Sequence, residues 1–237
     1  MDDRFNPSKG THASPPADEA ELLKRTRQIA GRTLEMLAQS QGIEVPPDQR
    51  RAKGWTGQLL EAVLGATAKS KAEMDFEALN IELKTLPIDA RGLPTESTYV
   101  CVVPLTDLEH LSWQSSWVRK KLSRVLWIPV EASKEIPLSQ RRVGTALLWS
   151  PDPDHEDALR ADWTELTDMI RLGEVESITA HMGDVLQIRP KAADARARRE
   201  GVDEHGHRMA TLPRGFYLRT RFTREILGRY YASGDGR

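Results

Sequence analysis

Residues 80–86 read Asn-Ile-Glu-Leu-Lys-Thr-Leu. Because side chains alternate between the two faces of an extended strand, Ile81 and Leu83 share one face and Glu82 and Lys84 share the other. The stretch therefore predicts a half-buried strand that presents an acid and a lysine side by side. The same pattern is common on exposed strand surfaces, where such a pair contributes at most about 1 kcal/mol, so the spacing alone is weak evidence for a functional site.

The segments on either side of this strand predict an alternation of helices and strands. Helices are expected over 18–30, from a cap at Thr33 through Leu37, and over 57–66, 154–172, 192–200 and a last segment capped by Thr223. Further strands are expected over 98–103, 124–130, 143–149 and 216–219, and a hairpin over 178–181 and 185–189 with its turn at 182–184. Strands with helices between them imply an α/β or α+β domain.

The clearest helix is the one over 154–172. Leu159, Trp163, Leu166 and Ile170 form its apolar stripe, and its many acids are expected to form the solvated outer face.

The chain has 237 residues, which is enough for one large domain or for two small lobes that share a cleft. Residues 1–17 are polar and contain three prolines, so they predict a flexible N-terminal tail. We expect a single domain over 18–231 and a short C-terminal tail over 232–237. One cysteine excludes an internal disulfide and a multi-cysteine zinc site, and no apolar run is long enough to cross a membrane. These features favour a cytoplasmic protein without a membrane partner.

The net charge of −1 gives no hint of a nucleic-acid partner, but the charges are unevenly distributed. Residues 152–176 carry nine acids and two arginines, whereas residues 189–229 carry eleven basic and five acidic residues. A second basic block lies within 119–142. Two basic blocks on one face would form a polyanion site, although solvated surfaces are the simpler interpretation of the charges alone.

Hydrolysis of a phosphodiester requires an activated water and positive charge against the transition state, and a divalent metal held by carboxylates supplies both. Mg²⁺ prefers hard oxygen ligands, usually one or two carboxylates with water and phosphate oxygens. Asp75 precedes the strand and can fold back towards Glu82, with Lys84 beside it. Glu61 lies off the centre of the apolar stripe of its helix, so its position is compatible with a site or with a solvated surface.

Longer stretches of sequence resemble the MutH family of methyl-directed mismatch-repair endonucleases. The matching blocks are 53–55, 59–61, 64–65, 70–71, 75–76, 82–85, 121–122, 124–131, 140–144, 148–151, 187–192 and 212–218. They span about residues 18 to 230 in one order, which is far more specific than a short acid–lysine pattern. The resemblance implies a restriction-endonuclease-like α/β fold, with a mixed β-sheet flanked by helices, that forms a two-lobed clamp around a DNA cleft.

The resemblance also implies a role for individual residues in catalysis. Asp75 and Glu82 would be the main metal ligands and Glu61 a third acid, with Mg²⁺ as the cofactor and Mn²⁺ or Ca²⁺ as alternative occupants. Lys84 would orient or deprotonate the attacking water, and Lys121 would act at the scissile phosphate. Lys53, just before the helix that carries Glu61, would assist in the same cleft.

DNA recognition is implied for the C-terminal part of the chain. Arg189 and Pro190 match the strand that approaches the bases, and Tyr217 matches the aromatic residue that senses the N6-methyl group of adenine. Steric rejection of that methyl group in the major groove is physically reasonable. Tyr99 stands where the family leads us to expect phenylalanine in a DNA-facing loop, which leaves its contribution open. Arg189 is also compatible with a simple phosphate contact.

The activity implied by the resemblance is nicking of the unmethylated strand at hemimethylated GATC by a monomer. The partners are double-stranded DNA, MutL as the activator and MutS indirectly. Two alternatives stay open, namely a GATC restriction enzyme that cuts both strands and a non-catalytic, methylation-sensing DNA-binding protein.

Overall fold

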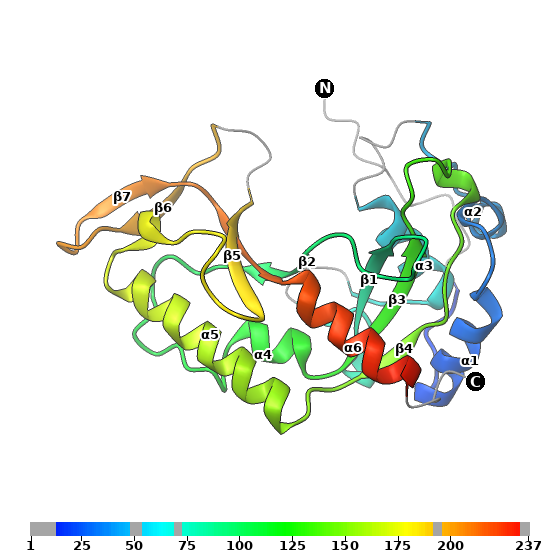
Figure 1. The fold of residues 1–237 in the computed structure, drawn as a ribbon, viewed down its shortest axis with the longest axis horizontal. Helices are drawn as coiled ribbons and strands as arrows, with labels where there is room; N and C mark the ends of the chain where they lie inside the picture. Colours follow the sequence, from blue (N-terminus) through cyan, green and yellow to red (C-terminus); the bar gives the residue numbers. More distant parts are fainter. Residues whose placement is uncertain (1–12, 48–53, 69–72, 192–195, 233–237) are drawn as a thin grey trace. The chain divides into compact units, whose positions relative to one another are not determined.

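A computed structural model describes residues 13–47, 54–68, 73–191 and 196–232. Within these residues the chain divides into two compact units (Figure 1). The first unit comprises the described parts of 13–95 together with 124–149, and the second comprises 96–123 together with the described parts of 150–232. The chain therefore passes from the first unit to the second, back again, and once more to the second.

The first unit contains helices α1 (Glu19–Ile29), α2 (Leu34–Gln41) and α3 (Trp55–Leu64) and strands β1 (Glu82–Ile88), β3 (Val125–Glu131) and β4 (Leu147–Trp149). The second contains helices α4 (Trp117–Leu122), α5 (Pro153–Arg171) and α6 (Thr220–Ala232) and strands β2 (Thr98–Val102), β5 (Leu186–Pro190), β6 (Arg199–Val202), β7 (Arg208–Thr211) and β8 (Arg214–Leu218). Short 3₁₀ helices lie at Glu77–Leu79, Leu138–Gln140 and Val175–Ser177.

The sheet of the first unit is mixed and has the order β1-β3-β4. β1 runs parallel to β3 with Glu82 opposite Val125, and β4 runs antiparallel to β3. α3 packs against β1, and it also contacts α1 and α2 (Figure 1). As predicted, the hydroxyl of Thr33 accepts the N–H of Met36 at the start of α2.

Leu83 lies in the hydrophobic core of this unit, as the alternation in 80–86 predicts. It shares the core with Ile81, with Leu126 and Ile128 of β3, and with buried leucines of α1, α2 and α3. The expectation of a half-buried strand is wrong, because Glu82 and Leu86 on the opposite face are buried as well. The core nevertheless fixes which face of β1 Leu83 lies on. Because a slip of one residue would exchange the two faces, it also fixes where Glu82 and Lys84 point.

The second unit has an antiparallel sheet with the order β2-β8-β5 and a separate β6-β7 hairpin. The apolar stripe predicted for 154–172 is confirmed, since Leu159, Trp163, Leu166 and Ile170 of α5 are all buried. The prediction that the acids of this helix form its solvated face is wrong for Asp162, which is only 6% exposed. An α/β architecture is thus confirmed, but the strands form several small sheets, of which only β1-β3-β4 is mixed.

The predicted hairpin of 178–181 with 185–189 is wrong. Residues 178–181 form no strand, whereas β5 pairs along its length with β8, with Leu186 opposite Leu218. The physical reason is that the N–H groups of Asp184, Val185 and Leu186 are all accepted by the carboxylate of Asp162.

Three other element predictions differ from the structure. Of the helix predicted over 192–200, residues 192–195 lie outside the described residues, and Arg199–Val202 is instead a strand paired with β7. Thr223 does not cap α6, because that helix begins at Thr220 and the Thr223 hydroxyl donates to the Thr220 carbonyl oxygen. The strand predicted over 143–149 is shortened to Leu147–Trp149, because the backbone of Val143 bonds with Gly31 and Arg32.

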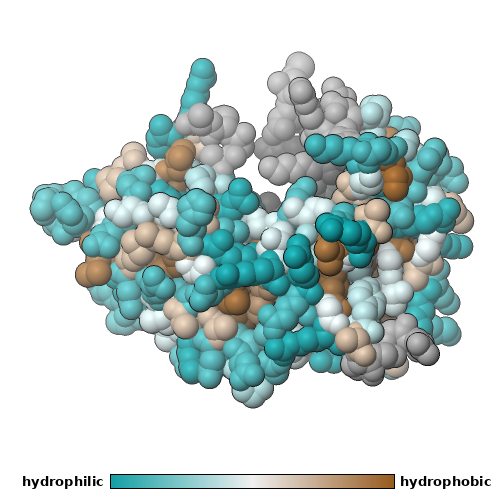
Figure 2. All heavy atoms as spheres, viewed as in Figure 1, coloured by the Kyte–Doolittle hydropathy of each residue, from teal (hydrophilic) through white to brown (hydrophobic). Residues whose placement is uncertain are grey.

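Hydrophilic residues cover most of the face seen in Figure 2, and hydrophobic residues form only small separate areas on it. Within the described ranges, no helix is both long enough and apolar enough to cross a membrane. Cys101, for which the apolar run 99–103 predicted burial, is only partly buried.

Candidate active site

Asp75 is brought back to β1 by a tight reversal of the chain. Phe76 and Ile81 form a two-way backbone bridge, in which the Phe76 N–H donates to the Ile81 oxygen at 2.9 Å and the Ile81 N–H donates to the Phe76 oxygen at 3.2 Å. Asn80, with φ of 55°, closes the turn between them. The N–H of Leu83 then donates to Oδ2 of Asp75 at 2.8 Å. The predicted approach of Asp75 to the strand is confirmed.

Glu82 and Lys84 form an ion pair on the face of β1 opposite Leu83. The distance between Lys84 Nζ and Glu82 Oε1 is 2.7 Å, and their side chains are 12% and 4% exposed. A salt bridge this deeply buried differs from the solvated surface pair that the spacing also allowed. Its two charges are therefore held in a fixed place where water screens them only weakly.

The electrostatic environment of Asp75 is unfavourable for a negative charge. Burial, together with the charges of Glu82 and Glu61, raises the pKa of Asp75 to about 7, against the hydrogen bond from Leu83 and the charge of Lys84, which lower it. Glu61, on α3, is one of the acids whose charge raises the pKa of Asp75. Carboxyl groups whose pKa is strongly raised by burial and by neighbouring acids cluster at functional sites.

The donor types at this position suit a hard divalent cation, because carboxylate oxygens are its preferred ligands and its charge would relieve their mutual repulsion. However, no three Asp, Glu, His or Cys side chains in the described part of the chain are arranged so that they could hold one ion together. The acids therefore share an electrostatic environment without forming an assembled triad of ligands.

Two further candidates are the DNA-binding candidate Lys53 and the catalytic candidate Lys121. Lys53 belongs to 48–53 and is outside the described residues. Lys121 lies in the last turn of α4, in the second unit, and is only 4% exposed.

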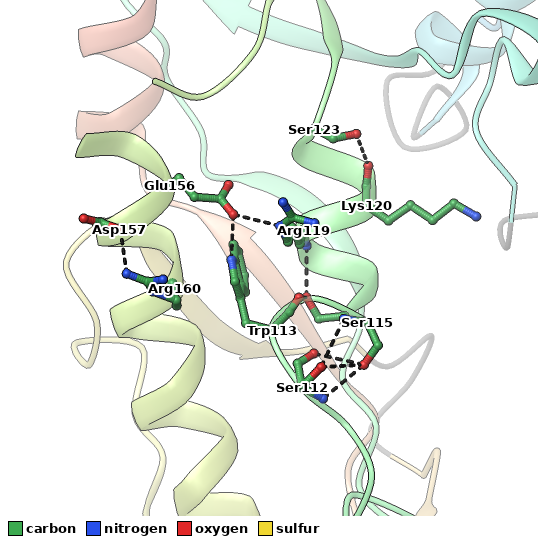
Figure 3. A network of polar contacts seen from close by, with 10 residues as sticks. Ser112, Trp113, Ser115, Arg119, Lys120, Ser123, Glu156, Asp157 and Arg160 are labelled. Carbon is green, nitrogen blue, oxygen red and sulfur yellow. Dashed lines mark hydrogen bonds and ion pairs between the residues drawn. The ribbon is translucent and has the colours of Figure 1, made fainter. Parts of the chain in front are cut away.

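A network of polar contacts holds α4 against the beginning of α5 (Figure 3). A single oxygen of Glu156, Oε1, accepts the indole N–H of Trp113 at 2.7 Å and the Nε–H of Arg119 at 2.8 Å. Ser116 caps α4 by accepting the N–H of Arg119 at 3.1 Å. Because α4 has only six residues, its orientation depends on such contacts rather than on its own stability. Glu156 was not among the residues that the sequence predicted.

Three recognition candidates, Tyr99, Arg189 and Tyr217, lie on one face of the β2-β8-β5 sheet. Tyr99 lies opposite Tyr217 in the strand register, and their rings meet edge to face with centroids 5.4 Å apart. The guanidinium carbon of Arg189 lies 5.9 Å from the centroid of the Tyr217 ring, and its Nη1 donates to Ser97 Oγ at 2.8 Å. Pro190, the last residue of β5, is exposed. The strands thus bring Tyr99, Arg189 and Tyr217 together, whereas Pro190, the next residue after Arg189, lies on the opposite face of β5.

Two residues of this neighbourhood were not predicted as site residues. Nζ of Lys191 lies 2.7 Å from the centroid of the Tyr99 ring, in a cation–π contact. Gly215 lies opposite Arg189, and a Cβ atom there would stand 3.0 Å from the Tyr99 ring and 3.1 Å from the Tyr217 ring. Glycine therefore leaves the space in which the two rings meet. A lysine that directly follows Arg189-Pro190 was a signal that could have found the first of them.

Burial raises the pKa of the Tyr217 phenol above its ordinary value, more than the nearby Arg189 lowers it. The hydroxyl is therefore uncharged at neutral pH. A neutral ring edge and two neighbouring cations make a surface that suits both a base edge and a phosphate.

Comparison with known proteins shows similarity to DNA mismatch-repair proteins. The family model described as DNA mismatch repair enzyme MutH matches residues 64–162. A DNA mismatch repair protein MutH from Klebsiella pneumoniae (strain 342) is 57% identical over 219 residues, which cover 92% of this chain and 95% of that protein. The proteins of the same name from Vibrio cholerae serotype O1 (strain O395) and Yersinia enterocolitica are 57% and 55% identical, over 92% of this chain and 98% and 96% of their own lengths. The chain belongs to the MutH family of DNA mismatch-repair enzymes.

Proposed function

We propose that this chain is the endonuclease of a DNA mismatch-repair system and that it nicks the unmethylated strand at hemimethylated GATC sites. The observation that carries the proposal is the grouping of Asp75, Glu82 and Lys84 at one buried place, in a chain that belongs to a mismatch-repair family. The repulsion between two buried acids lowers the stability of the fold. The same acids, with a lysine beside them, are suited to hydrolysis at a metal ion.

Asp75 and Glu82 are the proposed ligands of Mg²⁺, with Glu61 as the third acid. When bound, the ion supplies positive charge against the phosphate and lowers the pKa of a bound water. The raised pKa of Asp75 supports this assignment, because a divalent cation would replace the proton that otherwise neutralises the carboxyl. Mn²⁺ and Ca²⁺ have the same preference for oxygen ligands and are proposed as alternative occupants.

The lysines complete the proposed chemistry. Lys84 Nζ, which is held by Glu82 at 2.7 Å, orients the attacking water and takes part in its deprotonation. Lys121 neutralises charge on the scissile phosphate, and Lys53 assists in the same cleft. The role of Lys121 explains why a short helix such as α4 is tied to α5 by Glu156.

We further propose that Arg189 and Pro190 approach the GATC bases and that Tyr217 rejects the N6-methyl group of adenine by steric contact. The edge-to-face contact with Tyr99 stiffens the Tyr217 ring, and a rigid ring discriminates a methyl group better than a mobile one. Tyr99 retains the aromatic edge that a phenylalanine would offer, which supports a part for it in this recognition surface.

The wider assignments also follow from the family. We propose that residues 18–231 form one nuclease domain, with tails at 1–17 and 232–237, and that it acts as a monomeric two-lobed clamp on duplex DNA in the cytoplasm. MutL would activate it after MutS has found a mismatch.

A plasmid with one hemimethylated GATC site tests the proposal. Mg²⁺ should convert the supercoiled plasmid into nicked circles, with the nick in the unmethylated strand, and DNA ligase should reseal it because the ends are a 5′-phosphate and a 3′-hydroxyl. Chelation of the metal should stop the reaction. Linear product would favour the restriction-enzyme alternative, and binding without cutting at any metal concentration would favour the methylation-sensing binder. A plasmid without GATC is the control.

A further inference from the structure

Asp162 is a buried carboxylate for which the proposed chemistry has no use. It lies in the middle of α5, between Arg160 and the buried Trp163, and is 6% exposed. An ionised or polar group at such a depth is costly unless its hydrogen-bonding capacity is satisfied. Its partners therefore indicate why it is there.

Successive backbone N–H groups of one loop converge on this carboxylate. The N–H of Asp184 lies 2.8 Å from both Asp162 oxygens, and the N–H groups of Val185 and Leu186 donate to Oδ2 at 2.6 and 2.8 Å. Consecutive N–H groups that point to one centre form an anion-binding nest. Here the anion is a side chain of the same protein, so the loop 183–186 is tied to α5.

The rest of the loop is built around the same contact. Gly183 has φ of 78°, and a Cβ atom there would stand 2.0 Å from the Leu186 carbonyl oxygen and 3.3 Å from Cγ of Asp162. Arg219 donates to the carbonyl oxygens of Ala180 and Met182 at 2.9 and 2.7 Å. The N–H groups of 184–186 thus donate to Asp162, and the carbonyl groups of Ala180 and Met182, just before the loop, accept from Arg219, so side chains hold both parts of the segment.

The loop leads directly into β5, the strand that carries Arg189 and Pro190. β5 lies at the edge of its sheet and pairs only with β8 there, so its register depends on one neighbour and on its starting point. Because a slip of one residue turns every side chain of a strand to the opposite face, the start of β5 decides whether Arg189 lies beside Tyr217. Asp162 holds that start at Leu186, three residues before Arg189.

We propose that Asp162 is a positioning residue for DNA recognition, which acts by fixing the start and the register of β5 so that Arg189 faces the bases. The inference rests on the proposed function, because it assumes that Arg189 contacts GATC. It assigns to α5 a part in sequence recognition through a residue that itself touches no DNA.

The test compares binding to two duplexes of equal length, one with GATC and one without, in a Glu82→Ala background that prevents cutting. Asp162→Asn keeps one oxygen but places an amide NH₂ group among N–H donors, so the nest is filled less well. We expect it to weaken binding to the GATC duplex about tenfold, which corresponds to about 1.4 kcal/mol, and to leave binding to the other duplex unchanged. Asp162→Ala should have a larger effect in the same direction.

The matched control is Asp157→Asn, which changes an exposed acid of the same helix that pairs with Arg160 at 2.7 Å (Figure 3). It should leave both affinities unchanged. Gly183→Ala disturbs the loop from its other side and should reproduce the loss of selectivity, which keeps the test decisive if Asp162→Ala proves too unstable to assay. Thermal melting followed by circular dichroism gives a temperature at which every variant is folded, and binding is measured at that temperature.

A double-mutant cycle separates positioning from a general structural effect. In an Arg189→Ala background, Asp162→Asn should cause no further loss of selectivity, because the residue that it positions is gone. Equal losses on both duplexes, additive losses in the cycle, or unchanged selectivity in both Asp162→Asn and Gly183→Ala would each overturn the inference. Failure of the parent protein to prefer GATC at all would instead refute the proposed function.

Discussion

The main-chain N–H of Leu83 donates to Oδ2 of Asp75 at 2.8 Å, although the two residues are eight positions apart. This bond fastens the acid to the backbone of the same strand that presents Glu82 and Lys84. It therefore keeps the Asp75 carboxylate in a buried position, next to a second acid, where its charge is unfavourable.

Asp75→Asn should stabilise the metal-free protein at neutral and higher pH. The amide oxygen can still accept the Leu83 N–H, whereas the unfavourable charge is removed. Because the pKa of Asp75 is raised to about 7 in the folded state, the folded protein holds a proton that the unfolded chain releases near its ordinary lower pKa. Stability is therefore lost as the pH rises from about 4 to about 7. We expect the variant to melt about 5 °C higher than the parent at pH 8 in EDTA.

The thermal-melting measurement has an internal control in Asp89→Asn. Hydrogen bonds from Leu93 and Arg91 hold the pKa of Asp89 below its usual value, so removal of this charge should not stabilise the protein at pH 8. Between pH 4 and pH 7, the melting temperature of the parent should fall relative to that of Asp75→Asn. A constant difference between the two proteins would contradict the electrostatic description of the site.

Lys84→Ala should lower the rate of nicking by several orders of magnitude with little change in DNA affinity. The Lys84 side chain is buried in an ion pair with Glu82. We therefore expect it to act on the reacting groups and to add little to the binding of the DNA backbone. Single-turnover nicking and a binding titration measure the two effects. Lys120→Ala, which removes an exposed lysine that stacks on Trp117, is the control. A small change in rate for Lys84→Ala would reassign the role of this lysine.

Tyr217→Ala should narrow the difference in rate between unmethylated and hemimethylated GATC substrates, because the ring that excludes the methyl group is gone. Tyr217→Phe keeps the ring and should keep the discrimination. Gly215→Ala should act in the same direction as Tyr217→Ala, since its Cβ atom would displace the rings of Tyr99 and Tyr217. Rates on the two substrates under identical conditions give the comparison. Intact discrimination in Tyr217→Ala would place the methyl sensor elsewhere.

Glu156→Ala should reduce the nicking rate about tenfold, because α4 loses the oxygen that binds both Trp113 and Arg119. Glu156→Gln keeps an acceptor oxygen and should restore most of the rate. If Glu156 acts through Lys121, its loss should have no further effect in a Lys121→Ala background. Independent, multiplicative effects of the two substitutions on the rate would argue that Glu156 supports the fold alone.

The sequence predicted well those features that depend on local periodicity. The alternation in 80–86 placed Leu83 in the core and Glu82 beside Lys84, and the apolar stripe of 154–172 placed α5 correctly. In both segments the apolar side chains that the pattern groups together lie in a core, so the pattern and the tertiary structure favour the same arrangement. The pairing of Asp75 with this strand also followed from its short distance along the chain.

Features that depend on distant contacts could not be read from local patterns. The acid at position 162 has the same charge as its exposed neighbours on α5, and only the loop at 184–186 distinguishes it. The strand at 199–202 also lacks a strong pattern, although its partner β7 follows shortly after it in a hairpin, with Val202 opposite Arg208. Likewise, residues 178–181 do not form the expected strand, because β5 pairs with β8, which lies about thirty residues further along the chain. For Asp162 and for 178–181, a tertiary contact outweighed local preference.

The alternating path of the chain between the two units has a consequence for its synthesis. The first unit lacks β3 and β4 until residue 149 has been made, and the edge strand β2 lacks its neighbour β8 until residue 218 has been made. A nascent chain on the ribosome therefore carries an unpaired strand for most of its production. Neither unit can be obtained by truncation at a single point, so fragments expressed separately should be insoluble unless they are brought together again.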